Sequence, residues 1–327
     1  MSSPSWVEQF ETQGFCVHDG LVLPSALKSL QEAAARATAR AREGKWHHGI
    51  RTAASPFPPY EQDPTKDVWA VHMLCHPDMG EPVFLDWYGS DAVRATCAAL
   101  LHVQPDELQM EHINFLCNPQ KESFGLPWHR DIIPNSASPD EELAGLKSTC
   151  AAVVQWNTAL VEDRCLLVVP GSHLRQRTEE ERHASVPGPD LANGGMGKLP
   201  NEVRVVLQPG ETVFYHPDLL HRAEYDHTVL RQTLHCSIGV GIGDLGVKRA
   251  AGLSFVLGRE KMMSLTGAKF IDSLSGRPAL KEMHRLLMLS LDKAKEQGLV
   301  PATDEEDPRN QAFKDLVDTA GKEVAKD

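Results

Sequence analysis

The pattern of apolar and polar positions divides the chain into a helical front, a strand-rich middle and a helical tail. A short helix at the front is predicted to end at Gly14, a residue type common just after a helix. A second helix is predicted over Leu23–Ala37, where apolar side chains recur on one face. A third is predicted over Ser90–Leu101, with Ser90 as its N-cap.

Between residues 109 and 240 the pattern changes to short β-branched and apolar runs separated by Pro and Gly. These runs predict strands at Glu111–Cys117, Thr149–Asn157, Cys165–Val169, Val203–Leu207, Thr212–Tyr215 and Arg231–Val240. Many short strands without intervening helices predict a β sandwich or barrel. We interpret residues 44–66, 132–148 and 174–202 as loops, the last a mobile surface loop and a candidate lid.

The pattern returns to helix from Leu253 onwards. An amphipathic helix is predicted over Ala279–Gln297, with Gly298 as its stop. Pro301–Pro308 is interpreted as a linker, and Asp307–Ala325 as a charged, weakly amphipathic segment.

Charge and cysteine content narrow the classes of function for this chain of 327 residues. The net charge is −12, and there is no basic block of five or more residues, so we expect no nucleic-acid partner. Seven scattered cysteines without a C-x-x-C pair indicate reduced thiols and a cytoplasmic protein. The start of the chain lacks the features of a secretory signal, and no apolar run approaches 18 residues, so no membrane partner is expected.

The most informative segment for chemistry is Trp128-His-Arg-Asp131. In an extended segment the side chains of residues i and i+2 point to the same side, so His129 and Asp131 can offer one nitrogen and one oxygen to one metal ion. An H-x-D pair alone is a weak signal, because it also occurs in polar loops. His129 and Asp131 are therefore a candidate half of a metal site.

A second segment adds the missing groups. A turn and a strand lead to His216 and His221, and Arg231 follows. Two His and one carboxylate form the facial triad of non-haem Fe(II) oxygenases. Arg231 on a neighbouring strand can hold a carboxylate bidentately. Either His216 or His221 can complete the triad on this reasoning.

The chain resembles the phytanoyl-CoA dioxygenase family of Fe(II)/2-oxoglutarate oxygenases over most of residues 5–240. Four segments carry the resemblance in family order: residues 9–24, Trp128–Asp131, Cys165–His173 with its Pro-Gly-Ser-His turn, and Gly210–His221. The resemblance implies a double-stranded β-helix (jelly roll) with helices outside it. We therefore expect a jelly-roll domain over residues 1–250 and a helical extension over 251–327 packed on the same domain.

The resemblance also implies an activity and its site. His129, Asp131 and His221 would bind Fe(II), with 2-oxoglutarate and O2 as co-substrates. His221 is favoured over His216 because it lies ten residues before Arg231, close to the family's usual spacing, whereas His216 lies fifteen before it. Arg231 would hold the C5 carboxylate of 2-oxoglutarate. The expected reaction is oxidation of a small, largely apolar molecule by hydroxylation, desaturation or ring chemistry, with 2-oxoglutarate decarboxylated to succinate and CO2.

Further residues are candidates around this site. His112, Asn114 and Asn157 are candidate contacts of 2-oxoglutarate, although a hydrogen-bonded core role is open for each. Trp128 and Ile133 are candidate substrate contacts, with packing the first interpretation for Trp128. His173 is interpreted as part of the turn. Asp163-Arg164 stands where the family has Asn-Gly, a departure expected to alter only a turn.

Two other classes of function remain open at this point. A jelly-roll protein can hold a metal such as zinc for isomerisation or hydrolysis, although it would not need Arg231. The helical tail over 253–327 can also serve as a binding or scaffold surface, or simply support the barrel. We expect a monomer or homodimer with a small-molecule substrate.

Overall fold

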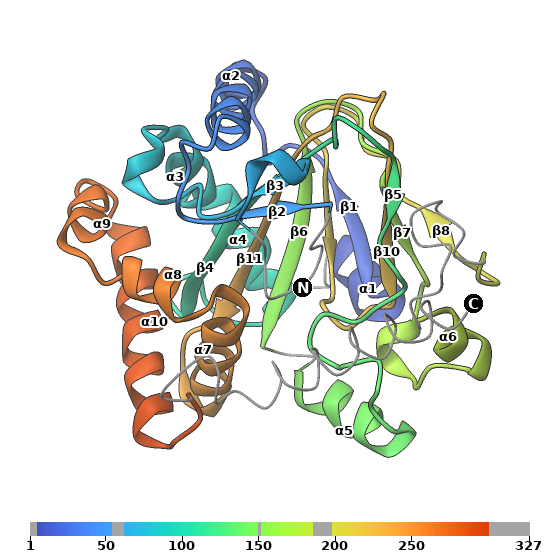
Figure 1. The fold of residues 1–327 in the computed structure, drawn as a ribbon. Coiled ribbons are helices and arrows are strands. Elements are labelled where there is room, and N and C mark those ends of the chain that lie inside the picture. The colour runs from blue at the N-terminus through green and yellow to red at the C-terminus, as the bar shows by residue number, and fades with distance from the viewer. Residues whose placement is uncertain (1–4, 54–61, 150–151, 186–197, 301–327) are drawn as a thin grey trace.

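Two antiparallel sheets face each other at the centre of the molecule in the computed structural model, which describes residues 5–53, 62–149, 152–185 and 198–300 (Figure 1). The major sheet has the order β1 (Phe15–His18), β9 (Thr212–Tyr215), β6 (Val153–Ala159), β11 (Gln232–Val240), β4 (Leu108–Cys117), β3 (Val68–Val71) and β2 (Ile50–Thr52). The minor sheet has the order β5 (Phe124–Gly125), β10 (His221–Tyr225), β7 (Leu166–Val168) and β8 (Val203–Arg204). The predicted jelly roll is confirmed.

Helices cover the outer side of the major sheet and one end of the barrel (Figure 1). The helices are α1 (Ser5–Gln13), α2 (Pro24–Arg42), α3 (Val83–Tyr88), α4 (Asp91–Leu101), α5 (Pro139–Thr149), α6 (Glu179–Ala184), α7 (Gly243–Leu257), α8 (Arg259–Ser264), α9 (Ala268–Ser273) and α10 (Pro278–Glu296). Short 3-10 turns lie at η1 (Pro64–Lys66), η2 (Pro77–Met79) and η3 (Ser172–Leu174). No described helix is long and apolar enough to cross a membrane.

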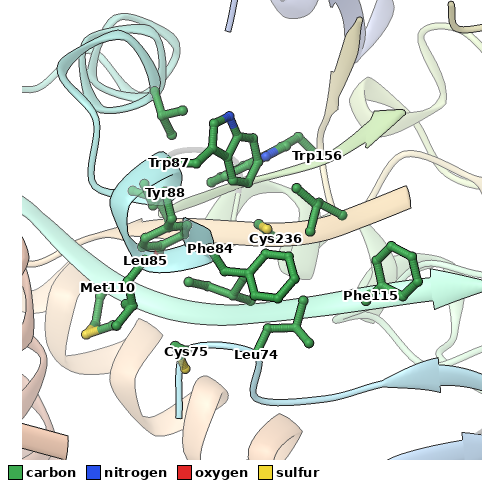
Figure 2. Packing of buried hydrophobic residues seen from close by; sticks show 14 of the residues in the cluster. Leu74, Cys75, Phe84, Leu85, Trp87, Tyr88, Met110, Phe115, Trp156 and Cys236 are labelled. Atoms are coloured by element: carbon green, nitrogen blue, oxygen red, sulfur yellow. The ribbon is translucent and has the colours of Figure 1, made fainter. Parts of the chain in front are cut away.

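The outer face of the major sheet carries the main apolar core. Successive strand residues point to opposite faces, and β11 alternates accordingly. Leu234, Cys236 and Ile238 are fully buried in the same cluster as the apolar residues of α3, α4, α7 and α10. Figure 2 shows Cys236 and Trp156 of this face packed beside Phe84, Trp87 and Tyr88 of α3. This packing fixes the helices on the sheet.

The inner face of the same strands is polar. On β11, Thr233, His235 and Ser237 alternate with the apolar residues of the outer face. His235 is paired in register with Asn114 of β4 on one side and Asn157 of β6 on the other. Cross-strand partners point to the same face of a sheet, so polar groups from three strands gather between the two sheets.

Several helix predictions are confirmed in detail. Helix α1 ends before Gly14, which adopts φ +81°. Ser90 caps α4, and its hydroxyl accepts a hydrogen bond from the Val93 N–H. Helix α10 ends at Glu296, close to the predicted stop at Gly298.

Two loop predictions are wrong. Residues 132–148 contain most of α5, whose start is fixed by reciprocal bonds between Ser138 and Glu141. That capping box is a sequence signal that periodicity alone missed. The predicted strand from Thr149 therefore begins only at Val153, with residues 150–151 outside the described part. The segment 44–66 contains β2, an edge strand that exists because it pairs with β3.

A third loop prediction is wrong in part, and two strands differ in length from the prediction. Helix α6 lies inside the predicted loop 174–202, and a Thr178–Glu181 capping box starts it. Residues 186–197 of that loop lie outside the described residues. Strand β4 begins at Leu108, three residues earlier than predicted, and β8 is two residues long instead of five.

The C-terminal helices pack on the barrel. Leu253 of α7 and Leu287 of α10 are fully buried in the main core, and α10 contacts both α7 and β4. The boundary expected at residue 250 lies inside α7. The predicted linker and the segment after it lie outside the described residues. The described helices thus support the barrel.

Candidate metal centre and oxo-acid site

His129, Asp131 and His221 converge at one end of the space between the sheets. His129 Nε2 lies 3.5 Å from Asp131 Oδ1, and His221 Nε2 lies 3.7 Å from Asp131 Oδ2. Backbone hydrogen bonds between His129 and His221 in both directions, of 3.0 and 3.1 Å, hold the two strand segments together. One ligand atom from each residue lies within 4.8 Å of the others. Residues far apart in sequence therefore form one cluster.

Both imidazoles are oriented for metal binding. His129 Nδ1 donates to the Pro127 carbonyl at 2.6 Å, and His221 Nδ1 donates to the Leu219 carbonyl at 2.7 Å. A neutral imidazole whose Nδ1 carries the hydrogen presents a lone pair at Nε2, the atom that faces Asp131 in each case. Burial lowers the pKa of His221 to about 4, despite the opposing effect of Asp131, so this ring is neutral near pH 7.

The Asp131 carboxylate completes the cluster. Gln155 of β6 donates from Nε2 to Asp131 Oδ2 at 2.5 Å. Burial alone would raise the pKa of Asp131, but His221, His129 and the Gln155 amide more than offset it and hold that pKa well below the usual range. Asp131 is therefore ionised. Its side chain keeps 36% exposure, against 7% for His221, so the cluster is open on one side.

The Pro-Gly-Ser-His turn positions the distal histidine. The Ser172 hydroxyl accepts a 2.8 Å hydrogen bond from the Leu220 N–H, directly before His221. His173 Nε2 donates to the Glu11 carbonyl at 3.0 Å, and its ring lies against Gly14. A Cβ at residue 14 would approach His173 Nδ1 to 2.5 Å, so Gly14 serves both the helix end and this contact.

A buried cluster of ion pairs anchors the segment that carries His129 and Asp131. Arg130, between His129 and Asp131, donates from Nε to Glu142 of α5 at 2.8 Å. Arg177 and Arg182 also pair with Glu142, whose side chain is completely buried. Further bonds tie Arg130 to the Asp218 and Ser172 carbonyls. The H-x-D segment is thereby fixed to α5 and to the Ser172 turn.

Arg231 is buried at the start of β11 with one nitrogen unsatisfied. Its Nε pairs with Asp163 at 3.1 Å, and its guanidinium lies 4.6 Å from the centre of the Tyr225 ring. Its Nη1 is buried without a hydrogen-bond partner. A buried unpaired donor is rare, and a ligand carboxylate would satisfy it.

Asp163 is more than a turn residue, contrary to the sequence interpretation. Its side chain is 4% exposed, and it accepts hydrogen bonds from Arg231 and Thr233. Burial would raise its pKa, but Arg231 and then Thr233 hold that pKa below the usual value. The Asp163 carboxylate fixes the Arg231 side chain through this ion pair. The two residues are far apart in the sequence, so the sequence around Asp163 does not predict the pair.

Tyr215 packs beside the metal cluster. Its ring lies edge-on to His221, with centroids 5.2 Å apart. Burial and, to a smaller extent, the Asp131 carboxylate raise the pKa of the Tyr215 phenol, whereas Arg231 lowers it. Sequence reasoning missed Tyr215 and Gln155, although both face inward in register on β9 and β6.

The other predicted residues occupy different surroundings. Asn157 accepts from His235 Nδ1 at 2.9 Å, and Asn114 Oδ1 accepts from the Met73 N–H at 3.2 Å. Each amide therefore keeps its NH2 group for another partner. His112 lies on the inner side with its ring centroid 5.3 Å from that of His235, a residue that the sequence analysis missed.

Trp128 and Ile133 are packed into the protein. Trp128 is fully buried among Leu167, Val169, Leu199 and Leu220, with the Arg222 guanidinium 5.2 Å from its ring centre. Ile133 is buried against Gly145 of α5. His216 lies outside the metal cluster, and its Nδ1 accepts from the Asp218 N–H.

The described residues contain one other group with metal-ligand geometry, formed by His48, His76 and Asp78. His48 Nε2 is 2.9 Å from Asp78 Oδ2, and the Asp78 carboxylate also pairs with Lys269. His76 Nδ1 accepts the Asp78 N–H. These mutual bonds satisfy the group without an ion.

The cluster of His129, Asp131 and His221 fits Fe(II), and Arg231 fits 2-oxoglutarate. Two imidazole nitrogens and one carboxylate, open on one side, form the facial donor set that suits non-haem Fe(II). The unpaired Arg231 Nη1 offers a permanent charge to a carboxylate of 2-oxoglutarate.

Comparisons with known proteins agree with this geometry. A family model described as phytanoyl-CoA dioxygenase matches residues 10–229. No match was found among curated proteins. Similar solved structures include AviO1 from Streptomyces viridochromogenes Tue57, with 18% identity and a TM-score of 0.50 over 72% of this chain and 93% of that one. EctD from S. alaskensis with bound Fe has 15% identity and a TM-score of 0.51 over 73% and 77%.

EctD has also been solved with 2-oxoglutarate and 5-hydroxyectoine, with 15% identity and a TM-score of 0.50 over 73% of this chain and 76% of that one. These likenesses support the jelly-roll fold. The family model covers well over half of the chain. The chain therefore belongs to the phytanoyl-CoA dioxygenase family, whose members are enzymes that use Fe(II), 2-oxoglutarate and O2.

Proposed function

We propose that this enzyme oxidises a small organic molecule by hydroxylation, desaturation or ring chemistry, while 2-oxoglutarate is converted to succinate and CO2. The observation that carries the proposal is the convergence of His129, Asp131 and His221. Arg231 also supports the proposal. Its Nη1 is buried without a partner and can donate a hydrogen bond to the C5 carboxylate of 2-oxoglutarate.

Each residue has a defined task in this proposal. His129, Asp131 and His221 would hold Fe(II), which supplies the activation of O2 when it is bound with the oxo acid. Arg231 would bind the C5 carboxylate through Nη1, while Asp163 holds its Nε. Gln155 would keep Asp131 in place through its amide. Tyr215 would pack beside His221 and shield the cluster from water.

The lining of the interior bears on the substrate. The sequence favours a largely apolar molecule, but the inner face of the major sheet presents Asn114, Asn157, His112 and His235. Buried polar groups require hydrogen-bond partners, so we propose a substrate with polar groups that match them.

The alternative functions receive less support. A zinc isomerase or hydrolase would have no use for Arg231 with a buried, unpaired Nη1. A scaffold role for the tail is disfavoured by the burial of Leu253 and Leu287 against the barrel. We keep a cytoplasmic location and a monomeric or homodimeric state as proposals.

Succinate formation tests the proposal directly. Purified protein with Fe(II), 2-oxoglutarate and air should produce succinate, and Asp131→Ala should abolish it and weaken Fe(II) binding measured by titration. Asp78→Asn, at the other His/Asp group, is the matched control and should retain both properties. Full occupancy by zinc that iron cannot replace, together with no 2-oxoglutarate binding, would contradict the proposal.

A further inference from the structure

His112 of β4 carries a buried nitrogen without a partner. Its side chain is inside the barrel, where the residue is 5% exposed, and its Nε2 makes no hydrogen bond. Nearly all buried polar atoms in proteins are paired, so this atom calls for an explanation.

A β-bulge places His112 beside two other polar residues. Cys236 pairs with Ile113 and Ile238 pairs with Met110, so Glu111 and His112 of β4 together oppose the single residue Ser237 of β11. Bulges of this kind redirect side chains and are frequent next to active sites. Here the bulge brings Glu111 and His112 to the same serine hydroxyl.

A chain of hydrogen bonds then fixes the tautomer of His112. Arg249 of α7 holds both Glu111 oxygens, at 2.6 and 2.5 Å, and the Ser237 hydroxyl donates its only hydrogen to Glu111 Oε2 at 2.5 Å. Towards His112 Nδ1, 3.1 Å away, Ser237 can therefore only accept. The hydrogen of the neutral imidazole must lie on Nδ1, which leaves a lone pair at Nε2.

Two further observations support this arrangement. Burial, with help from Arg249 and Arg51, lowers the pKa of His112 to about 3, so the ring stays neutral. Gly239 makes the ion pair possible, because a Cβ at that position would clash with Glu111 Oε1.

The neighbouring His235 donates from Nδ1 to Asn157, so its Nε2 is an acceptor as well.

The expected co-substrate, 2-oxoglutarate, cannot donate a hydrogen bond to His112 Nε2. 2-Oxoglutarate, with two carboxylates and a keto oxygen, has only hydrogen-bond acceptors at neutral pH. We infer that His112 Nε2 is a specificity-determining acceptor for a hydroxyl or N–H group of the substrate, with Arg249, Glu111 and Ser237 as positioning residues. This inference rests on the proposed function and names the kind of group that its substrate carries.

Nuclear magnetic resonance of histidine nitrogens tests the tautomer. Protein labelled with 15N-histidine and loaded with Zn(II) and 2-oxoglutarate should show His112 with a protonated Nδ1 and an unprotonated Nε2, assigned by the signals lost in His112→Gln. Ser237→Ala should change this tautomer, and Ser237→Thr, which keeps the hydroxyl, should restore it. Ser290→Ala removes another buried serine hydroxyl and should leave the His112 signals unchanged. An Nε2–H tautomer in the unaltered protein would overturn the inference.

Matched small molecules test the recognition. The probes are benzyl alcohol and cyclohexanol, each compared with its methyl ether, which lacks the donor hydrogen. An alcohol should shift the His112 Nε2 signal and bind about three- to tenfold more tightly than its ether, the range for one neutral hydrogen bond. Ser237→Ala should remove this preference. Equal responses to both members of each pair, or no response of Nε2 to any probe, would overturn the inference.

The test is independent of turnover. It uses zinc in place of iron and measures no succinate. If succinate formation fails but Nε2 responds to alcohols, the proposed reaction is wrong and the acceptor site stands. If succinate forms and Nε2 does not respond, only the present inference is wrong.

Discussion

The two faces of the strands β6, β11 and β4 differ in composition and in task. On the outer face, Trp156, Cys236 and Phe115 belong to the main apolar cluster, where Trp156 and Cys236 lie beside α3 (Figure 2). On the inner face, Gln155 and His235 lie one residue away from them and bond to polar groups. The same strands therefore supply the stability on one side and the chemistry on the other.

The physical demands of the two faces explain the difference. Apolar contacts on the outer face are non-directional, so they need volume and shape. Each inner polar group needs a partner at a defined distance, because a buried group without one is destabilising. Substitution of Trp156 should therefore lower stability, whereas substitution of the adjacent Gln155 should lower metal affinity.

Trp156→Ala should have the largest effect, and it should act on stability. Trp156 is fully buried, and truncation of such a residue lowers the free energy of unfolding by about 3–5 kcal/mol. Urea denaturation of the metal-free protein measures this effect. A change below about 1 kcal/mol would show that the outer face is not the main source of stability.

Arg231→Lys should weaken 2-oxoglutarate binding while the charge next to Asp163 is kept. A lysine loses the fork geometry of the guanidinium, and a hydrogen bond to a charged group contributes about 1.5–3 kcal/mol, so the Kd should rise about 10- to 100-fold. Isothermal titration calorimetry with the Zn(II)-loaded protein measures it. Arg204→Lys, at an exposed ion pair with Glu224, is the control. An unchanged Kd would place the carboxylate elsewhere.

Gln155→Ala should act on the metal site and little on stability. Loss of the amide that holds Asp131 should reduce Fe(II) affinity about 10- to 100-fold, as for other residues that orient metal ligands. Competition with a chelator measures the affinity. Gln109→Ala removes another buried glutamine, on β4, and should leave Fe(II) affinity unchanged. A large loss of stability without a change in affinity would remove the distinction between the faces.

The polar inner face should also make the stability of the fold decrease in acid, and this is the smallest of the four predicted effects. Because the folded-state pKa of His112 is about 3 and that of an unfolded histidine is about 6.5, only the unfolded chain takes up a proton between these values. Stability must therefore fall as the pH falls through this window. From pH 6.5 to 5.5, the unaltered protein should lose about 1 kcal/mol more than His112→Gln in urea denaturation. Equal losses would contradict a neutral His112.

The sequence predicted the parts of the site that have local signals. The H-x-D spacing and the strand that leads to His216 and His221 predicted a cluster, and the family resemblance favoured His221. The structure brings His221 to His129 and Asp131. Helix α5 also has a local signal, the capping box of Ser138 and Glu141, which the periodicity of apolar positions does not reveal. Such errors can be avoided with the sequence alone.

Other parts depend on register and could not be predicted. Gln155 reaches Asp131, and Asp163 reaches Arg231, only because particular strands pair in particular registers. The meeting of Glu111 and His112 at Ser237 requires a bulge. The apolar alternation of β4 changes phase at Glu111 and His112, but this change does not identify Ser237 as their partner. Contacts of this kind position the residues that would bind the metal ion, 2-oxoglutarate and the substrate.

Glu142 has a consequence for attempts to change the substrate range of this enzyme. Loops and helices near the mouth of a barrel are the usual targets for grafting, and α5 is such a segment. Yet Glu142 is the carboxylate shared by Arg130, Arg177 and Arg182. A grafted α5 without an acid at this position would leave three guanidiniums repelling one another beside His129 and Asp131. Any exchange of this helix must carry that one carboxylate with it.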